Sequence, residues 1–198
     1  MKTLQSTLAD QDIRPLLRSH LRDNAGRADF VMLEELGVCR GRVRIDIAVV
    51  NGSFCGYEIK SDRDSLRRLA EQVQFYDKVL DRATLVVGKR HLDEASRIIP
   101  EWWGILCIDP AAGARRFRSL RAGTWNPGRD PRALVEFLWL ENAVALLEAQ
   151  GAARGIRGKP RRVVWDRICE NFQIDEIAAA VREHLKARAR QSGLQSPS

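Results

Sequence analysis

The sequence is poor in the residues that build disulfide frameworks and zinc centres. Its 198 residues include only four cysteines and three histidines. No two cysteines form a CxxC pair, and the histidines are scattered along the chain. This spacing argues against a structural zinc site and predicts buried free thiols, as expected in a reducing cytoplasm.

A long apolar run is also missing. No stretch approaches the roughly 20 residues that a membrane-spanning helix needs, and residues 1–6 lack the apolar core of a signal peptide. The content of 44% hydrophobic and 30% charged residues is typical of a soluble globular protein. We therefore expect a cytoplasmic protein without a membrane partner, built as one domain with an appendage. Homodimerisation is left open.

Acidic residues become scarce in the C-terminal part of the chain. Residues 1–110 hold 17 basic and 17 acidic residues, whereas residues 111–198 hold 16 basic and 9 acidic ones, so the whole net charge of +7 lies there. A concentrated basic region predicts a polyanionic partner, and ordinary solubility charge is the alternative. The candidate phosphate contacts in this region are Arg154, Arg157, Lys159, Arg161 and Arg162.

Residues 43–60 predict two half-buried strands joined by a tight turn. Apolar residues occupy the odd positions and charged residues the even ones, which is the period of a strand with one buried face. Asn51-Gly52 is a strong hairpin signal. The apolar set is Val43, Ile45, Ile47, Val49, Cys55, Tyr57 and Ile59, and the charged set includes Arg44, Asp46, Glu58 and Lys60.

The length of the turn decides which side chains share a face. A two-residue loop would turn Glu58 away from Asp46. A three-residue loop, Val50-Asn51-Gly52, places Asp46 opposite Gly56, with Glu58 and Lys60 on the same face. Because a one-residue slip would split the apolar set, we expect the three-residue loop. The space beside Gly56 would then suit a hard cation.

The remaining pattern predicts an α/β core followed by a helical subdomain. Strands are expected over 83–88 and 104–109, and residues 30–38 fit a strand or the end of a helix. Helices are expected over 12–23, 61–80, 91–99, 131–149, 163–171 and 174–190. The expected organisation is a core of residues 1–112, a basic connection of 113–132, a helical subdomain of 133–190 and a disordered tail of 191–198.

Two spacings in the core resemble a known nuclease signature. Asp46 lies twelve residues before Glu58-Ile59-Lys60, which resembles the PD-(D/E)xK nuclease superfamily. Glu35 stands upstream, where that superfamily often has a further acidic residue, and Gln72-x-x-x-Tyr76 resembles the motif of RecB-type nucleases. The longer strings around these residues are similar to a largely uncharacterised bacterial and phage family of the same superfamily.

The resemblance implies a restriction-endonuclease-like core, a central mixed sheet flanked by helices, and an enzyme that hydrolyses DNA with a metal ion. Lys60 would orient and help deprotonate the attacking water, and Gln72 would reach the scissile phosphate or a flanking base. Arg44 and Tyr76 would contact the nucleic acid. The implied metal ligands are Asp46, Glu58, the Ile59 carbonyl and Glu35, and the implied ion is Mg²⁺ or Mn²⁺.

Alternatives stay open for several of these residues. Glu35 is also interpretable as a solvated carboxylate, and Arg44 as the partner of a carboxylate. Tyr76 lies in the apolar stripe of its helix, which favours a place in the core. Two other functions compete: the same fold used without cleavage to bind DNA or a protein, and a helix-turn-helix regulator formed by the last two helices.

Overall fold

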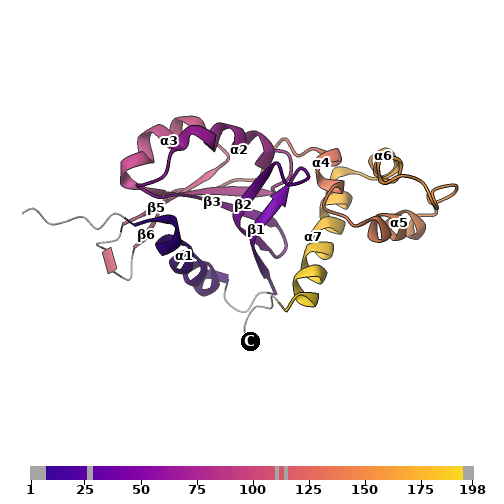
Figure 1. Cartoon of the computed structure of the whole chain (residues 1–198), viewed down its shortest axis with the longest axis horizontal. Coiled ribbons are helices and arrows are strands. Elements are labelled where there is room, and N and C mark those ends of the chain that lie inside the picture. Colours follow the sequence, from indigo (N-terminus) through magenta and orange to yellow (C-terminus); the bar gives the residue numbers. More distant parts are fainter. Residues whose placement is uncertain (1–7, 26–28, 110–111, 114–115, 194–198) are drawn as a thin grey trace, which may run out of the picture.

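The centre of the computed structural model is a six-stranded mixed sheet (Figure 1). The structure describes residues 8–25, 29–109, 112–113 and 116–193. The strands lie side by side in sequence order, and the β3–β4 and β4–β5 pairs are parallel while the other three pairs are antiparallel. The strands are β1 (Val31–Val38), β2 (Val43–Val50), β3 (Phe54–Lys60), β4 (Arg82–Gly88), β5 (Gly104–Ile108) and β6 (Phe117–Arg121).

Helices cover both faces of the sheet. Helix α1 lies against one face and α2 and α3 against the other, while α7 packs beside β1 and β2 and carries α4, α5 and α6 at its far side (Figure 1). Two apolar clusters result, one on each face. The helices are α1 (Asp10–Ala25), η1 (Leu66–Arg68), α2 (Leu69–Tyr76), η2 (Lys89–His91), α3 (Leu92–Ile98), α4 (Pro131–Val135), α5 (Leu140–Ala149), α6 (Arg161–Asn171) and α7 (Ile174–Gln191).

The predicted α/β class, with a central mixed sheet, flanking helices and a C-terminal helical region, is confirmed. The basic connection contains a strand that was not expected, β6, which pairs with β5. The predicted tail begins inside α7, whose last residue is Gln191, and residues 194–198 lie outside the described part.

All four cysteines are free, and one of them, Cys107, is buried. Among the described helices, none has the length and apolar character to cross a membrane.

The helix predicted over 131–149 is two helices. Trp139 adopts an extended conformation and caps α5, so the chain turns after α4. Phe137 and Leu138 are both buried, and the ring of Phe137 meets that of Phe54 edge-on at 5.5 Å. Both side chains are buried where the chain leaves the helix, so tertiary packing here overrides the predicted continuous helix.

The hairpin has the predicted three-residue loop, but its register differs by one pair. Val50 pairs with Phe54, so the loop is residues 51–53 instead of 50–52. Ala48 therefore stands opposite Gly56, where Asp46 was expected. The parity of the loop is as predicted, which leaves Asp46 and Glu58 able to reach the same side. The space expected beside Gly56 does not exist, because Leu80 fills it.

The prediction that all odd positions of the hairpin share one buried face is wrong. Val43 and Ile45 lie in the cluster on the α2 side, whereas Ile47 and Val49 lie in the cluster on the α1 side. The change of face coincides with an irregularity in β1, where Glu35 has a φ of 50°. Strand β1 changes face at the same place, since Leu33 and Leu36 both lie in the cluster on the α2 side, while the register between β1 and β2 is unbroken. The irregularity sits beside Asp46 and therefore lies at the edge of the candidate site.

Gly56 is expected to resist substitution because of its close neighbour. A Cβ atom there would overlap Cδ1 of Leu80, which is itself fully buried. Gly56→Ala should therefore lower the free energy of unfolding by about 1–3 kcal/mol, the usual cost of overpacking a core. Urea unfolding measures the loss. The matched control is Gly52→Ala in the same hairpin, where a Cβ meets nothing within 4 Å; an equal loss in both variants would contradict the packing explanation.

Candidate functional site

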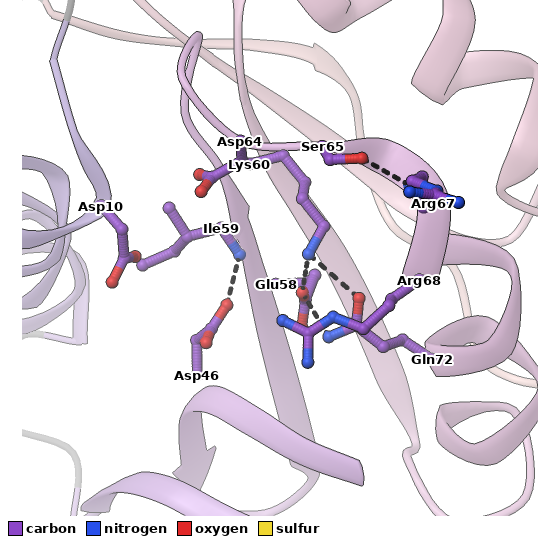
Figure 2. Close-up of a pocket in the computed structure, with 10 residues that line it drawn as sticks. All are labelled: Asp10, Asp46, Glu58, Ile59, Lys60, Asp64, Ser65, Arg67, Arg68 and Gln72. Atoms are coloured by element: carbon purple, nitrogen blue, oxygen red, sulfur yellow. Dashed lines mark hydrogen bonds and ion pairs between the residues drawn. The ribbon is translucent and has the colours of Figure 1, made fainter.

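One cavity of about 510 Å³ opens where β2 and β3 meet the start of α2 (Figure 2). Asp46 comes from β2, Glu58 and Lys60 come from the end of β3, and Gln72 comes from α2. All four side chains line this cavity, together with the turn that follows β3. The structure thus brings together four of the residues that the sequence singled out, from three separate elements.

Glu58 is the most buried charged group of the site, with 1% of its surface exposed. Its Oε1 accepts hydrogen bonds from Nζ of Lys60 and, at 2.6 Å, from Nε2 of Gln72. Nζ of Lys60 also donates to Oε1 of Gln72 at 3.0 Å, which closes a triangle of polar contacts (Figure 2). A buried carboxylate is stable only when paired and hydrogen-bonded in this way.

Tyr76 belongs to the core and not to a surface that nucleic acid could touch. Its side chain is fully buried and its ring stacks on Trp103 with centroids 5.8 Å apart. Its hydroxyl lies 2.6 Å from Oε2 of Glu58 and donates to it. Burial, and next the negative charge of Glu58, raises the pKa of Tyr76 well above its usual value. The phenol therefore keeps its proton and positions Glu58, and its predicted contact with nucleic acid is wrong.

Asp46 is a mostly buried carboxylate in this cavity, and its pKa is raised. Its side chain is 18% exposed, and its Oδ2 accepts a hydrogen bond from the N–H of Ile59 at 2.7 Å. Burial, and next the charge of Glu58, raises the pKa of Asp46 to about 7, although Arg14 and Lys60 act in the opposite direction. Burial and the neighbouring Glu58 thus disfavour the charged form of Asp46, and its ionisation falls near neutral pH.

The predicted metal ligands are not all brought together. Ile59 meets Asp46 through its N–H group, so it is not the carbonyl that faces this carboxylate. Glu35 is half exposed, pairs with Arg14 at 2.9 Å and lines a second cavity of about 340 Å³. Within the described ranges, no three histidine, cysteine or carboxylate side chains are arranged to hold a metal ion. Of the predicted ligand residues, Asp46 and Glu58 are the two whose carboxylates line the first cavity.

Two carboxylates fit one class of cation. Mg²⁺ prefers oxygen ligands, keeps several of its waters, and is commonly held by one or two carboxylates together with phosphate groups. Asp46 and Glu58 are carboxylates of this kind, and burial, and next the charge of Glu58, raises the pKa of Asp46 to about 7. When bound, the ion would supply positive charge for a phosphate group. The donor set fits Mg²⁺ or Mn²⁺ with an anionic ligand completing the shell.

Exposed arginines surround the mouths of the two cavities. Arg67 lines the first cavity, Arg42 and Arg44 line the second, and Arg68 lines both. Asp46 and Gln72 are also shared by the two cavities, so the hollows are continuous around them. Among the described residues, none of these four arginines forms an ion pair with a carboxylate. We call Arg42, Arg44, Arg67 and Arg68 the arginine rim.

The basic residues predicted to contact phosphates in the C-terminal part lie elsewhere. Arg154, Arg157 and Lys159 lie in the loop between α5 and α6, whereas Arg161 and Arg162 are the first two residues of α6. This part is at the end of the molecule away from the sheet (Figure 1). Some are partly engaged: Arg157 pairs with Glu148 at 3.3 Å, and the guanidinium of Arg161 lies over Trp165 at 5.6 Å. The five predicted contacts, Arg154, Arg157, Lys159, Arg161 and Arg162, are all exposed and do not join the cavity.

The last two predicted helices are present as α6 and α7. Ile177, Val181 and Leu185 are buried on one face of α7, which packs against α4, β1 and β2. The helix-turn-helix alternative stays a prediction.

Several residues of the site were not identified from the sequence. From α1, Asp10 lines the cavity and Arg14 contacts Asp46, and Arg67 and Arg68 follow the turn after β3. A weak signal existed for the first two, because residues four apart lie on one face of a helix. No local pattern shows that this face would meet β2, since the contact joins residues 32 apart in the sequence.

The fold and the site define an α/β protein with a charged double cavity at one end of a mixed sheet. The chain belongs to the family of bacteriophage P4 protein cII, since the model of that family matches residues 4–195. Protein cII of Enterobacteria phage P4 is 28% identical over 116 residues, which are 59% of this chain and 44% of that protein. The match thus spans less than half of this curated relative.

One solved structure is also similar. It is the SPO1766 protein of unknown function from Silicibacter pomeroyi, with a TM-score of 0.40 and 22% identity. The similarity covers 80% of this chain and 96% of that one.

The family assignment made from the motif is wrong. The model that matches nearly the whole chain is that of the phage P4 protein cII family and not of a PD-(D/E)xK nuclease, and the curated relative is a phage protein cII. The function drawn from the motif, hydrolysis of DNA by a metal-dependent nuclease, is overturned with it. Asp46, Glu58 and Lys60 are spaced as strands with a polar face often space such residues, so the motif alone did not identify a nuclease.

Proposed function

We propose that this protein binds nucleic acid through the phosphate backbone, with the arginine rim as the contact and a divalent cation between the phosphate and Asp46. One observation carries the proposal: four exposed arginines, which form no ion pair with a carboxylate in the described part of the chain, surround two joined cavities whose shared wall includes Asp46. The proposal concerns binding and assigns no reaction.

Unpaired arginines support a phosphate ligand. A guanidinium presents several N–H donors in a flat fork that matches the oxygens of a phosphate group. Surface arginines commonly pair with neighbouring carboxylates, as Arg18 pairs with Glu34 here. The arginine rim keeps its donors available although Glu71 lines the same second cavity. A run of phosphates passing along both cavities would meet all four arginines.

The acidic centre supports a cation instead of direct phosphate contact. Phosphate next to Asp46 and Glu58 would be repelled, because like charges at short range raise the free energy of the complex. A divalent ion held by these carboxylates reverses the sign of the local charge. The basic rim and acidic centre then become complementary to the same ligand.

Other expectations from the sequence stay predictions. These are the finer assignment of the sheet to the restriction-endonuclease-like type, enzymatic activity, the cytoplasmic location and the phosphate contacts of the α5–α6 loop and the start of α6. None of them is needed for the proposed binding.

Removing two rim arginines is expected to weaken DNA binding and to flatten its salt dependence. For duplex DNA, a plot of log affinity against log salt concentration has a negative slope, and each phosphate contact adds about 0.9 to its magnitude. Arg67→Ala/Arg68→Ala should therefore reduce the magnitude of this slope by about two. The affinity at low salt should fall by roughly tenfold or more. Fluorescence anisotropy with labelled single-stranded and duplex DNA, over a series of salt concentrations, measures both quantities.

The control carries the same change of charge at another place. Arg22→Ala/Arg97→Ala removes two exposed arginines that line neither cavity, and it should keep the wild-type slope to within about half a unit. A rim variant with the wild-type slope would contradict the proposal. The same titration on Arg161→Ala/Arg162→Ala tests the predicted contacts at the start of α6. At constant ionic strength, Mg²⁺ in place of EDTA should tighten binding by the wild type but not by Asp46→Asn.

A further inference from the structure

Arg14 places a positive charge where the carboxylates of the site converge. It belongs to α1, whose Ile13 and Leu17 are buried against the sheet, so the helix holds the side chain in place. Its Nη2 lies 3.2 Å from Oδ1 of Asp46, and its Nη1 donates to the carbonyl oxygen of Asp46 at 2.9 Å. The side chain is 17% exposed. The guanidinium is thus the direct counter-ion of the Asp46 carboxylate.

The same guanidinium has a second set of partners. Nη2 pairs with Asp10 at 3.0 Å, one helical turn before Arg14, and Nη1 pairs with Glu35 of β1 at 2.9 Å. These two carboxylates are 38% and 50% exposed. Arg14 could therefore release Asp46 and still remain paired with Asp10 and Glu35, so leaving Asp46 does not leave a buried cation alone.

A divalent cation at Asp46 would compete with this arrangement. The ion needs the same carboxylate oxygens that Arg14 contacts, and two positive charges within a few ångströms repel each other by several kcal/mol at the effective dielectric of a partly buried site. Lys60, on the other side, is engaged with Glu58 and Gln72 and does not contact Asp46. Among the described residues, Arg14 is the basic side chain that forms an ion pair with Asp46.

We propose that Arg14 is a built-in counter-ion that occupies the cation position at Asp46 and sets a low affinity for divalent ions, which bind by displacing it towards Asp10 and Glu35. This inference rests on the cation of the proposed function. Occupancy of Asp46 by the cation then depends on whether phosphate is bound. A phosphate group contributes its own oxygens to the cation, and this favours the displaced position of Arg14. The site then binds cation and phosphate together better than either alone.

Calorimetric titration of the intact protein with Mn²⁺, without nucleic acid, tests this inference. Arg14→Gln removes the charge and should bind Mn²⁺ at least about tenfold more tightly than the wild type. Arg18→Gln is the matched control: it lies one turn further along α1, pairs with Glu34 and does not contact Asp46. It should stay within about twofold of the wild type. Asp46→Asn should lose the binding.

The outcomes separate the two proposals. If Asp46→Asn loses Mn²⁺ binding but Arg14→Gln binds within twofold of the wild type, the role of Arg14 is overturned and the cation site stands. If none of the four proteins binds Mn²⁺, the cation site is overturned and the inference with it. Circular dichroism checks the fold of each variant. Should Arg14→Gln not fold, Arg14→Met, which also removes the charge, decides: binding at least about tenfold tighter than that of the wild type supports displacement, and an unchanged affinity overturns it.

Discussion

Replacing Asp81 by alanine is expected to lower the free energy of unfolding by about 3–5 kcal/mol, the usual effect of removing one partner from a buried ion pair. Asp81 stands just before β4 and is 1% exposed. It accepts hydrogen bonds from the N–H of Phe54 at 2.7 Å, from Arg129 at 2.7 Å and from Arg182 at 3.0 Å. The alanine variant would leave two arginines and one backbone N–H without their acceptor.

The loss should also loosen the C-terminal region from the sheet. Arg129 precedes α4 and Arg182 lies in α7, so the contacts of Asp81 join this region to the β3–β4 part of the core. Urea unfolding at neutral pH gives the stability. The matched control is Asp175→Ala, which removes the 80% exposed second partner of Arg129 and should cost less than about 1 kcal/mol. A similar small loss for Asp81→Ala would mean that the region is held by apolar packing alone.

The sequence was most informative where one physical period dominates. The helices α1 and α7 follow from helical spacing. The loop of the hairpin has the predicted odd length, although the apolar period used to predict it changes face within β2. It was least informative where pairing between distant residues decides. Residues 117–121 look like a basic loop, because the exposed side chains of this edge strand are largely polar, and β6 becomes a strand through its pairing with β5. No local pattern contains that information.

The same division holds for the site. Asp46, Glu58, Lys60 and Gln72 were found because neighbouring strands and the next helix place them together by short-range rules. Arg44 was also named from the sequence, as a contact of nucleic acid. Arg14, Arg67 and Arg68 were missed, because their approach to the site depends on where α1 and the turn after β3 pack. The motif also led to a wrong family. It described how carboxylates and a lysine lie on one strand end, and not which reaction or ligand the surrounding residues serve.

Replacing Asp46 by asparagine is expected to stabilise the protein at alkaline pH and not at acidic pH. Burial, and next the charge of Glu58, raises the pKa of Asp46 from 3.8 to about 7 in the folded protein. Between these values the folded protein holds a proton that the unfolded chain has lost, so stability falls as the pH rises through this window. The full penalty, up to about 4 kcal/mol at roughly 1.36 kcal/mol for each pKa unit, is present above pH 7.

Asparagine removes that penalty because it cannot ionise. Its amide oxygen can still accept the N–H of Ile59, but its NH₂ group cannot pair with Arg14, which offsets part of the gain. We therefore expect the variant to be more stable than the wild type by about 1–3 kcal/mol at pH 8 and to show no gain at pH 4.

Urea unfolding of the metal-free protein, in EDTA at both pH values, measures the difference. Glu34→Gln, which removes an exposed carboxylate on β1 paired with Arg18, should change stability by less than about 0.5 kcal/mol at both. A gain for Asp46→Asn that is the same at pH 4 and pH 8 would show that its cause is packing and not the charge of Asp46.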